Sequence, residues 1–87
     1  MRIETEAFLM GSQNIHSNKS GKDFVKINLI IEGEFVGFFT RKQDGDKIRT
    51  AKAFQDFEKT KAPVKCVAVL DVKFTQKGFF VDLMGLV

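Results

Sequence analysis

The sequence predicts one mainly β domain of five strands, with one short helix between the third and fourth strands. Hydrophobic residues alternate with a period of two over most of the chain, and clusters of Gly, Asn, Asp and Ser divide the alternating runs. Only residues 50–61 change to a period near 3.6. The 87 residues allow a single domain spanning residues 1–87, and 44% hydrophobic with 29% charged residues is a globular composition.

Residues 2–10 form the first expected strand, with Ile3, Ala7 and Leu9 on one face. Residues 11–22 are polar and contain two glycines and two asparagines, which accept positive φ angles. This segment is expected to be a long hairpin loop with basic residues at its tip.

The second expected strand, residues 23–32, places four aliphatic side chains on a core face: Val25, Ile27, Leu29 and Ile31. Its other face carries Phe24, Lys26 and Asn28. After a tight turn at residues 32–34, residues 35–42 form the third strand, which carries phenylalanine on both faces. Gly37 inside this strand predicts a bulge or a barrel bend, so the face that Phe39 and Arg41 occupy stays open.

Residues 43–47 are expected to be a loop, and residues 50–61 the helix. Thr50 is its predicted N-cap, and Pro63 ends it because the residue before a proline avoids helical geometry. Ala53, Phe54 and Phe57 line the buried side of this helix.

The fourth strand, residues 64–74, is nearly all apolar at its centre, which indicates an interior position in the sheet. Residues 75–78 connect it to the fifth strand, residues 79–86. Phe79 and Phe80 point to opposite faces, so at most one of them belongs to the core. This element order is that of a five-stranded OB-fold-like barrel. An SH3-like barrel, or an open sheet with a packed helix, is the alternative.

The residue inventory argues against an enzyme. One histidine gives no pair for a metal and no oriented general base, and Cys66 lies in the most apolar strand. No glycine-rich phosphate loop occurs, and Asp44 and Asp46 lack the further oxygen ligands of a calcium loop. No catalytic residue, metal site or cofactor is therefore expected.

The longest apolar run, residues 66–70, is far too short for a membrane helix, and charges near the N-terminus do not fit a signal peptide. A single cysteine forms no internal disulfide. These features predict a soluble, cytoplasmic protein. The net charge of +3 concentrates in residues 19–52 and is compatible with a nucleic-acid partner.

All ten aromatic residues are phenylalanines, and several are placed beside basic residues. Binding of single strands needs aromatic faces for base stacking and cations for phosphates. The pattern predicts a site on the second and third strands and on the loops between the first and second and between the fourth and fifth strands, made of Lys19, Lys22, Phe24, Lys26, Asn28, Phe39, Arg41 and Lys77. For each phenylalanine the alternative is ordinary packing, and for each charged residue it is a solvated side chain. Residue types alone do not show whether the partner is DNA or RNA.

The stretch Ser-Gly-Lys-Asp-Phe-Val-Lys-Ile-Asn-Leu at residues 20–29 resembles the start of the second strand in single-stranded DNA-binding OB-fold proteins of phage and plasmid type. The resemblance covers this stretch and the element order. It implies a homodimer that coats single-stranded DNA with little sequence preference during phage or plasmid replication. The chain departs from bacterial housekeeping single-strand binders, because it ends in apolar residues 83–87 and lacks their acidic tail.

A second class of function stays open: a small β-barrel that binds protein, such as a phage inhibitor or an assembly subunit, without binding nucleic acid. The position of the surplus phenylalanines separates the two. Phe24 and Phe39 exposed together beside lysines favour nucleic acid, whereas apolar clusters ringed by acidic residues favour a protein partner.

Overall fold

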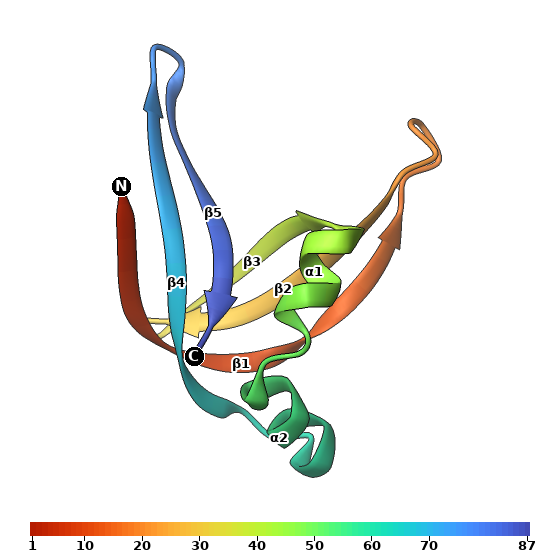
Figure 1. The fold of residues 1–87 in the computed structure, drawn as a ribbon, viewed down its shortest axis with the longest axis vertical. Helices are drawn as coiled ribbons and strands as arrows, with labels where there is room; N and C mark the ends of the chain where they lie inside the picture. The colour runs from red at the N-terminus through yellow and green to blue at the C-terminus, as the bar shows by residue number, and fades with distance from the viewer.

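A computed structural model describes all 87 residues and confirms the OB-like architecture. Five antiparallel strands form one curled sheet in the order β3-β2-β1-β4-β5, with two helices inserted between β3 and β4 (Figure 1). The elements are β1 (Arg2–His16), β2 (Asp23–Ile31), β3 (Glu34–Arg41), α1 (Lys42–Ile48), α2 (Lys52–Thr60), β4 (Val64–Thr75) and β5 (Gly78–Leu86).

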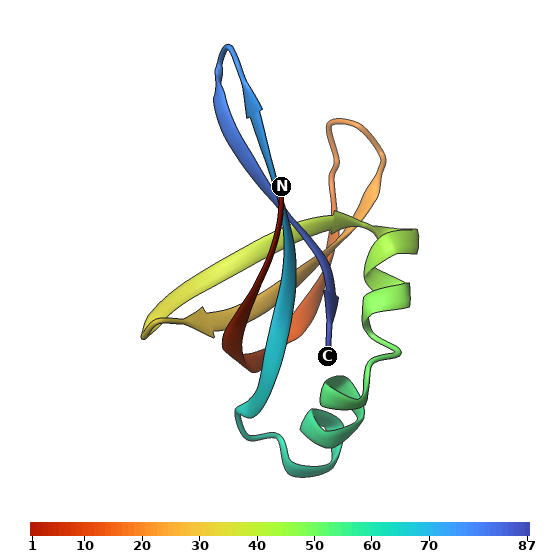
Figure 2. The ribbon, with the colours of Figure 1, turned by 60° about the vertical axis from the view of Figure 1, so that its left-hand side comes forward.

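The sheet curls into a half-barrel whose two edges, β3 and β5, are not joined by a hydrogen-bonded ladder. The β1–β2 and β4–β5 hairpins extend beyond the body of the barrel toward the same end of the molecule (Figures 1 and 2). The helices lie on the side of the barrel between β3 and β4 (Figure 2). The edge strands therefore keep unpaired backbone groups along an open seam.

The core fills the concave side of the sheet, and the predicted alternation of β2 is confirmed. Val25, Ile27 and Leu29 are fully buried, whereas Ile31 is half-buried at the end of the strand. The helices and the other strands complete the core with Ala7, Leu9, Phe38, Ile48, Ala53, Phe54, Cys66, Ala68, Leu70, Leu83 and Leu86.

Strand β1 is longer than the sequence pattern predicts, because a bulge hides its continuation. Its pairing with β2 shifts register between Leu9 and Gly11 and then continues to the His16–Asp23 pair. Gly11 has a φ of 122°, a value that favours glycine, and a Cβ there would lie 3.3 Å from the Phe57 ring. The expected loop over residues 11–22 therefore shrinks to residues 17–22.

Of the two features predicted at Gly37, a bulge or a barrel bend, the bulge is wrong. Strand β3 pairs with β2 in continuous register, with Gly37 opposite Asn28. A Cβ at residue 37 would lie 2.5 Å from Lys26 Cε. The Lys26 side chain therefore lies over Gly37, and Phe39 and Arg41 stay on the face that simple alternation gives them.

Residues 43–47, predicted as a loop, form most of helix α1. Gly45 favoured the prediction of a loop, but its role is to let helix α1 pack closely on the sheet. A Cβ at residue 45 would lie 2.5 Å from Val25 Cβ and 2.6 Å from Thr40 Oγ1. The helix thus rests on the sheet through its glycine, a contact that the local sequence does not reveal. Two helices, not one, connect β3 to β4.

Helix α2 matches the predicted period, although its predicted cap is wrong. Ala51 is the N-cap without a side-chain hydrogen bond, and the Thr50 hydroxyl donates instead to the Lys47 carbonyl at 2.7 Å. Phe54 is buried, Phe57 is half-buried, and the helix ends at Lys61 with a φ of 53°. Neither helix has the length or the apolar run that crossing a bilayer requires.

Strand β4 pairs with both β1 and β5, which confirms its interior position. At the fifth strand, Phe79 and Phe80 are both exposed, so neither belongs to the core. Leu83 and Leu86 are buried near the C-terminus. The apolar end of the chain therefore serves mainly the core.

Candidate nucleic-acid interface

The convex side of β2 and β3 carries five of the eight predicted site residues, and we call it the β2–β3 face. The register places Phe24 opposite Arg41, Lys26 opposite Phe39, and Asn28 opposite Gly37. Directly opposite residues of an antiparallel pair point to the same side of the sheet. The face therefore gathers Phe24, Lys26, Asn28, Phe39 and Arg41 on adjacent positions.

Lys26 and Phe39 form the centre of this face. The Lys26 ammonium lies 5.6 Å from the centroid of the Phe39 ring, within the range of a cation–π interaction. The Phe39 residue is 63% exposed, so its ring has a large accessible surface beside a cation. The missing side chain at Gly37 gives the Lys26 stem its path along the strand.

Phe24 is less accessible than Phe39. It is half-buried between Ile15 of β1 and Arg41 of β3, its cross-strand neighbours. A half-buried ring offers less surface to a base and contributes more to the packing of the hairpin. We therefore assign Phe39, and not Phe24, as the principal aromatic position.

The face continues beyond the predicted residues. Phe35 is 79% exposed and lies opposite Ile30, which in turn pairs with Phe8 of β1. The alternation of β3 could have identified Phe35, since it lies four residues from Phe39. Phe8 could not have been assigned to this surface without the pairing of β1 with β2.

The charge on the β2–β3 face is positive. The convex positions of β2 and β3 carry Lys26 and Arg41 and no carboxylate. Arg41 Nε donates to Asp44 Oδ2 of α1 at 3.0 Å, whereas Lys26 forms no ion pair within the chain. Lys26 is therefore available for an anionic ligand. Arg41 can bind such a ligand if it gives up its contact with Asp44, and an exposed ion pair of this kind contributes little to stability.

The three predicted loop lysines are divided between two hairpin tips. Lys19 and Lys22 lie in the β1–β2 connection, and Lys77 lies in the β4–β5 turn. None of them forms an ion pair. At the base of the first hairpin, His16 Nδ1 lies 2.7 Å from Asp23 Oδ1. The tips lie apart in both ribbon views, so the structure does not gather these lysines into one cluster (Figures 1 and 2).

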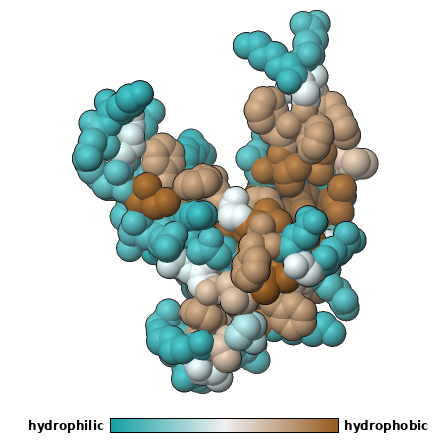
Figure 3. Space-filling view, turned by 180° about the vertical axis from the view of Figure 1, so that it is seen from behind, coloured by the Kyte–Doolittle hydropathy of each residue, from teal (hydrophilic) through white to brown (hydrophobic).

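A second group of exposed aromatic residues, absent from the predicted site, lies on the two faces of the β4–β5 hairpin, with Phe74 and Phe79 on one face and Phe80 on the other. Its residues are Phe74, Phe79 and Phe80, here called the hairpin phenylalanines, which are 72%, 66% and 56% exposed. The Phe74 and Phe79 ring centroids are 6.3 Å apart. Figure 3 shows apolar side chains along this hairpin beneath a hydrophilic tip. Exposed apolar side chains that gather on a projecting hairpin are typical of interaction surfaces.

Asp44 and Asp46, the aspartates considered above as cation ligands, both form ion pairs with neighbouring basic side chains. Asp44 pairs with Arg41, and Asp46 Oδ2 accepts a hydrogen bond from Lys42 Nζ at 2.7 Å. No three His, Cys, Asp or Glu side chains lie close enough together to hold a metal ion. Burial raises the pKa of the Cys66 thiol, and a hydrogen bond with the Leu9 backbone opposes this increase only in part.

The Cys66 thiol is expected to resist alkylation in the folded protein at pH 8 and to react once the chain is unfolded. A buried thiol with a raised pKa stays protonated, and the thiolate is the reactive form. The same shift predicts that stability is retained below the pKa of the unfolded thiol and falls as the pH rises through the folded value. Mass spectrometry after iodoacetamide treatment, with and without denaturant, measures how much of the Cys66 thiol is alkylated. Equal labelling of the folded and the unfolded chain would contradict the protection of this thiol.

Comparison with known proteins does not assign a family to this geometry. No protein-family model, curated protein or solved structure matches the chain. The resemblance of residues 20–29 therefore stays a prediction, and the functional inference depends on the residues of the β2–β3 face.

Proposed function

We propose that this chain is a non-catalytic, single-stranded DNA-binding protein that coats DNA with little sequence preference in the cytoplasm during phage or plasmid replication. The observation that carries this proposal is the Lys26 ammonium beside the exposed Phe39 ring. The convex positions around this pair bear no carboxylate. The ammonium group can bind a phosphate of a single strand, and the neighbouring ring can stack with a base of the same strand.

Binding would combine two physical effects. Bases stack on Phe39, and each such contact contributes about 1–3 kcal/mol without regard to base identity. Lys26 and Arg41 on the face, with Lys19 and Lys22 at the hairpin tip, neutralise phosphates and release counterions. Asn28, half-buried on the same face, offers an amide to a sugar or a base edge.

Fluorescence anisotropy with a labelled dT oligomer across a salt series tests this function. A dye-labelled oligomer is needed because the chain contains no Trp. We expect micromolar or tighter binding that weakens steeply with salt and exceeds the binding of a duplex. An RNA oligomer of the same length serves as competitor, since stacking and phosphate contacts do not by themselves detect a 2′-hydroxyl. No binding at low salt would overturn the proposal.

The double substitution Lys22→Ala with Lys26→Ala is expected to flatten the salt dependence of binding. Each phosphate contact on a single strand contributes a slope of about 0.7 in log K against log salt, so losing two contacts reduces the slope by about 1.4. Lys52→Ala with Lys59→Ala on helix α2 is the control with the same loss of charge. Equal slopes for the two double variants would remove Lys22 and Lys26 from the phosphate path.

The proposed protein acts as a homodimer, and the β4–β5 hairpin supplies its interface. Supporting this, Phe74 and Phe79 are 72% and 66% exposed on one face of the projecting hairpin, with their ring centroids 6.3 Å apart. Sedimentation equilibrium of the wild type and of Phe74→Ser with Phe79→Ser tests the interface. A monomeric wild type at micromolar concentration would contradict the dimer without affecting the DNA-binding proposal.

The alternative function, a protein-interaction module without nucleic-acid binding, is favoured by the same hairpin phenylalanines. Their exposure fits a partner protein as well as a second copy of the chain. Lys26 and Phe39 favour nucleic-acid binding over this alternative, because a purely apolar interface does not need a basic aromatic face. A monomer that binds no oligomer would instead favour the protein-interaction module.

A further inference from the structure

The open seam of the half-barrel contains a cleft that the sequence did not predict. Its volume is about 720 Å³, and it lies between the C-terminal end of β3, helix α1 and strand β5. Sites for small organic ligands span about 300–1,000 Å³. The cleft is therefore large enough for one nucleotide.

The cleft shares a wall with the β2–β3 face. Phe39 and Arg41 line it as well as belonging to that face. A single strand of DNA with one base stacked on Phe39 therefore reaches the rim of the cleft with its next nucleotide. On the opposite wall, β5 contributes Met84, whose side chain is exposed.

The lining of the cleft combines the surfaces that a nucleotide needs. Ile48, Leu83 and Leu86 provide a buried apolar floor. The free backbone edges of β3 and β5 provide donors and acceptors that the sheet leaves unpaired. An aromatic or aliphatic surface with a few polar groups at its margin is the usual form of a base-binding site.

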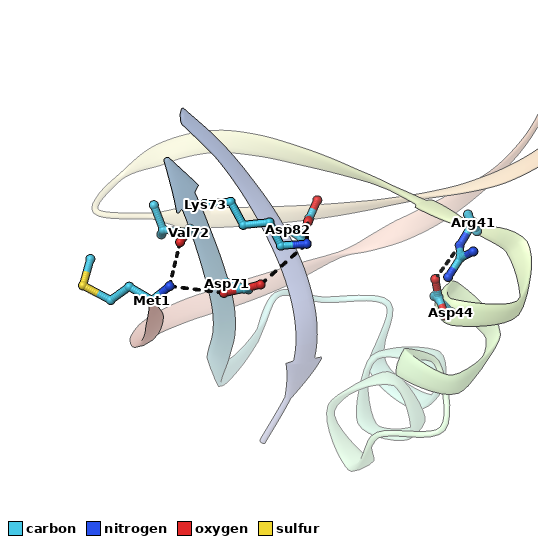
Figure 4. Close-up of polar contacts among 7 residues, drawn as sticks. All are labelled: Met1, Arg41, Asp44, Asp71, Val72, Lys73 and Asp82. Atoms are coloured by element: carbon cyan, nitrogen blue, oxygen red, sulfur yellow. Dashed lines mark hydrogen bonds and ion pairs between the residues drawn. The ribbon is translucent and has the colours of Figure 1, made fainter. Parts of the chain in front are cut away.

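The charges around the cleft leave one free cation. Arg41 pairs with Asp44, and Lys73 Nζ lies 3.7 Å from Asp82 Oδ2 on the other side (Figure 4). Lys47 of α1 lines the cleft, is exposed and forms no ion pair. One free lysine supplies charge for one phosphate group.

We propose that the cleft holds one base of the bound single strand, inserted past Phe39, with the adjoining phosphate on Lys47. This inference rests on the proposed function and adds a second binding subsite for the same single strand. An extended peptide paired with the free edge of β5 is the competing occupant. The wall shared with Phe39 and the unpaired Lys47 favour the nucleotide.

A tryptophan introduced at the rim reports directly on occupancy. Met84→Trp places an indole at an exposed strand position, where an aromatic residue is well tolerated, in a chain without other tryptophan. A dT oligomer is expected to quench this fluorescence saturably, in parallel with the anisotropy of the labelled oligomer. Gln55→Trp, on an exposed position of α2 that does not line the cleft, is expected to show no such quenching.

A charge reversal tests the phosphate contact. Lys47→Glu is expected to weaken oligomer binding about tenfold more than Lys59→Glu, as expected for loss of one charge-assisted contact. Lys59 is exposed on α2, forms no ion pair, and its reversal changes the net charge equally. Circular dichroism of both variants checks that the fold is retained.

The outcomes separate this inference from the proposed function. Quenching at residue 84 together with a larger effect of Lys47→Glu supports the nucleotide in the cleft. Oligomer binding with unquenched Trp fluorescence and equal effects of the two reversals overturns the cleft assignment and leaves the proposed function intact. Absence of oligomer binding by the wild-type chain overturns both.

Discussion

Replacing Phe39 with alanine is expected to weaken binding of a dT oligomer roughly tenfold to a hundredfold, because one base loses its stacking partner. The fold should be retained, since the residue is 63% exposed on an edge strand and belongs to no core cluster. The Lys26 ammonium loses the Phe39 ring in the same variant, although it keeps its own access to phosphate. Anisotropy measures the affinity, and thermal unfolding measures the stability.

Two further substitutions make this result specific. Phe80→Ala removes a ring of similar exposure, 56% against 63%, from the β4–β5 hairpin, away from the β2–β3 face, and is expected to change the affinity of the protein for the oligomer little. Phe24→Ala is expected to weaken binding less than Phe39→Ala, because its ring is half-buried. Unchanged affinity in Phe39→Ala would remove this residue from the site, and equal losses for Phe39 and Phe80 would indicate non-specific hydrophobic binding.

Replacing Gly45 with valine is expected to lower the free energy of unfolding by about 3 kcal/mol, at the upper end of typical overpacking costs. The new Cβ would lie 2.5 Å from Val25 Cβ and 2.6 Å from Thr40 Oγ1, so helix α1 must move away from the sheet. For a domain of this size, each kcal/mol lowers Tm by about 4–8 °C. The variant is therefore expected to melt about 10–25 °C below the wild type.

Gly85→Val is the matched control for this prediction. A Cβ at residue 85 meets no atom within 4 Å, and this position of β5 does not require a positive φ. Valine is favourable in strands, so the stability should stay within about 0.5 kcal/mol of the wild type. If Gly45→Val melted together with Gly85→Val, the close contact of α1 with the sheet would be wrong.

The β2–β3 face could be predicted in part from the sequence. Alternation alone places Lys26 beside Phe24 and Asn28, and places Phe39 beside Arg41. Whether the two sets share a surface depends on the pairing of the strands, which local patterns do not specify. Gly37 shows the difficulty, because a glycine in a strand predicts a bulge, whereas here it gives room to Lys26.

The accessible aromatic surface could not be predicted from residue types. Phe38 is buried, Phe39 is exposed and Phe24 is half-buried, although all three are phenylalanines of the same strand pair. Phe8 joins the face only through its pairing with Ile30, 22 positions along the chain. The hairpin phenylalanines are exposed because no other element covers the projecting β4–β5 hairpin.

The sequence by itself determined the order of five strands, the inward face of β2, and the amphipathic helix α2. On β1 it placed Ala7 and Leu9 correctly in the core, whereas Ile3, expected on the same face, is exposed near the end of the strand. These features depend on the period of neighbouring residues, which is a local property of the chain. Only the tertiary structure decided that residues 43–47 form a helix, that β1 continues past its bulge to His16, and that the seam between β3 and β5 stays open. Each of these depends on contacts between residues distant in sequence, such as Gly45 with Val25 or Gly11 with Phe57, and such contacts leave no periodic signal in the segments that make them.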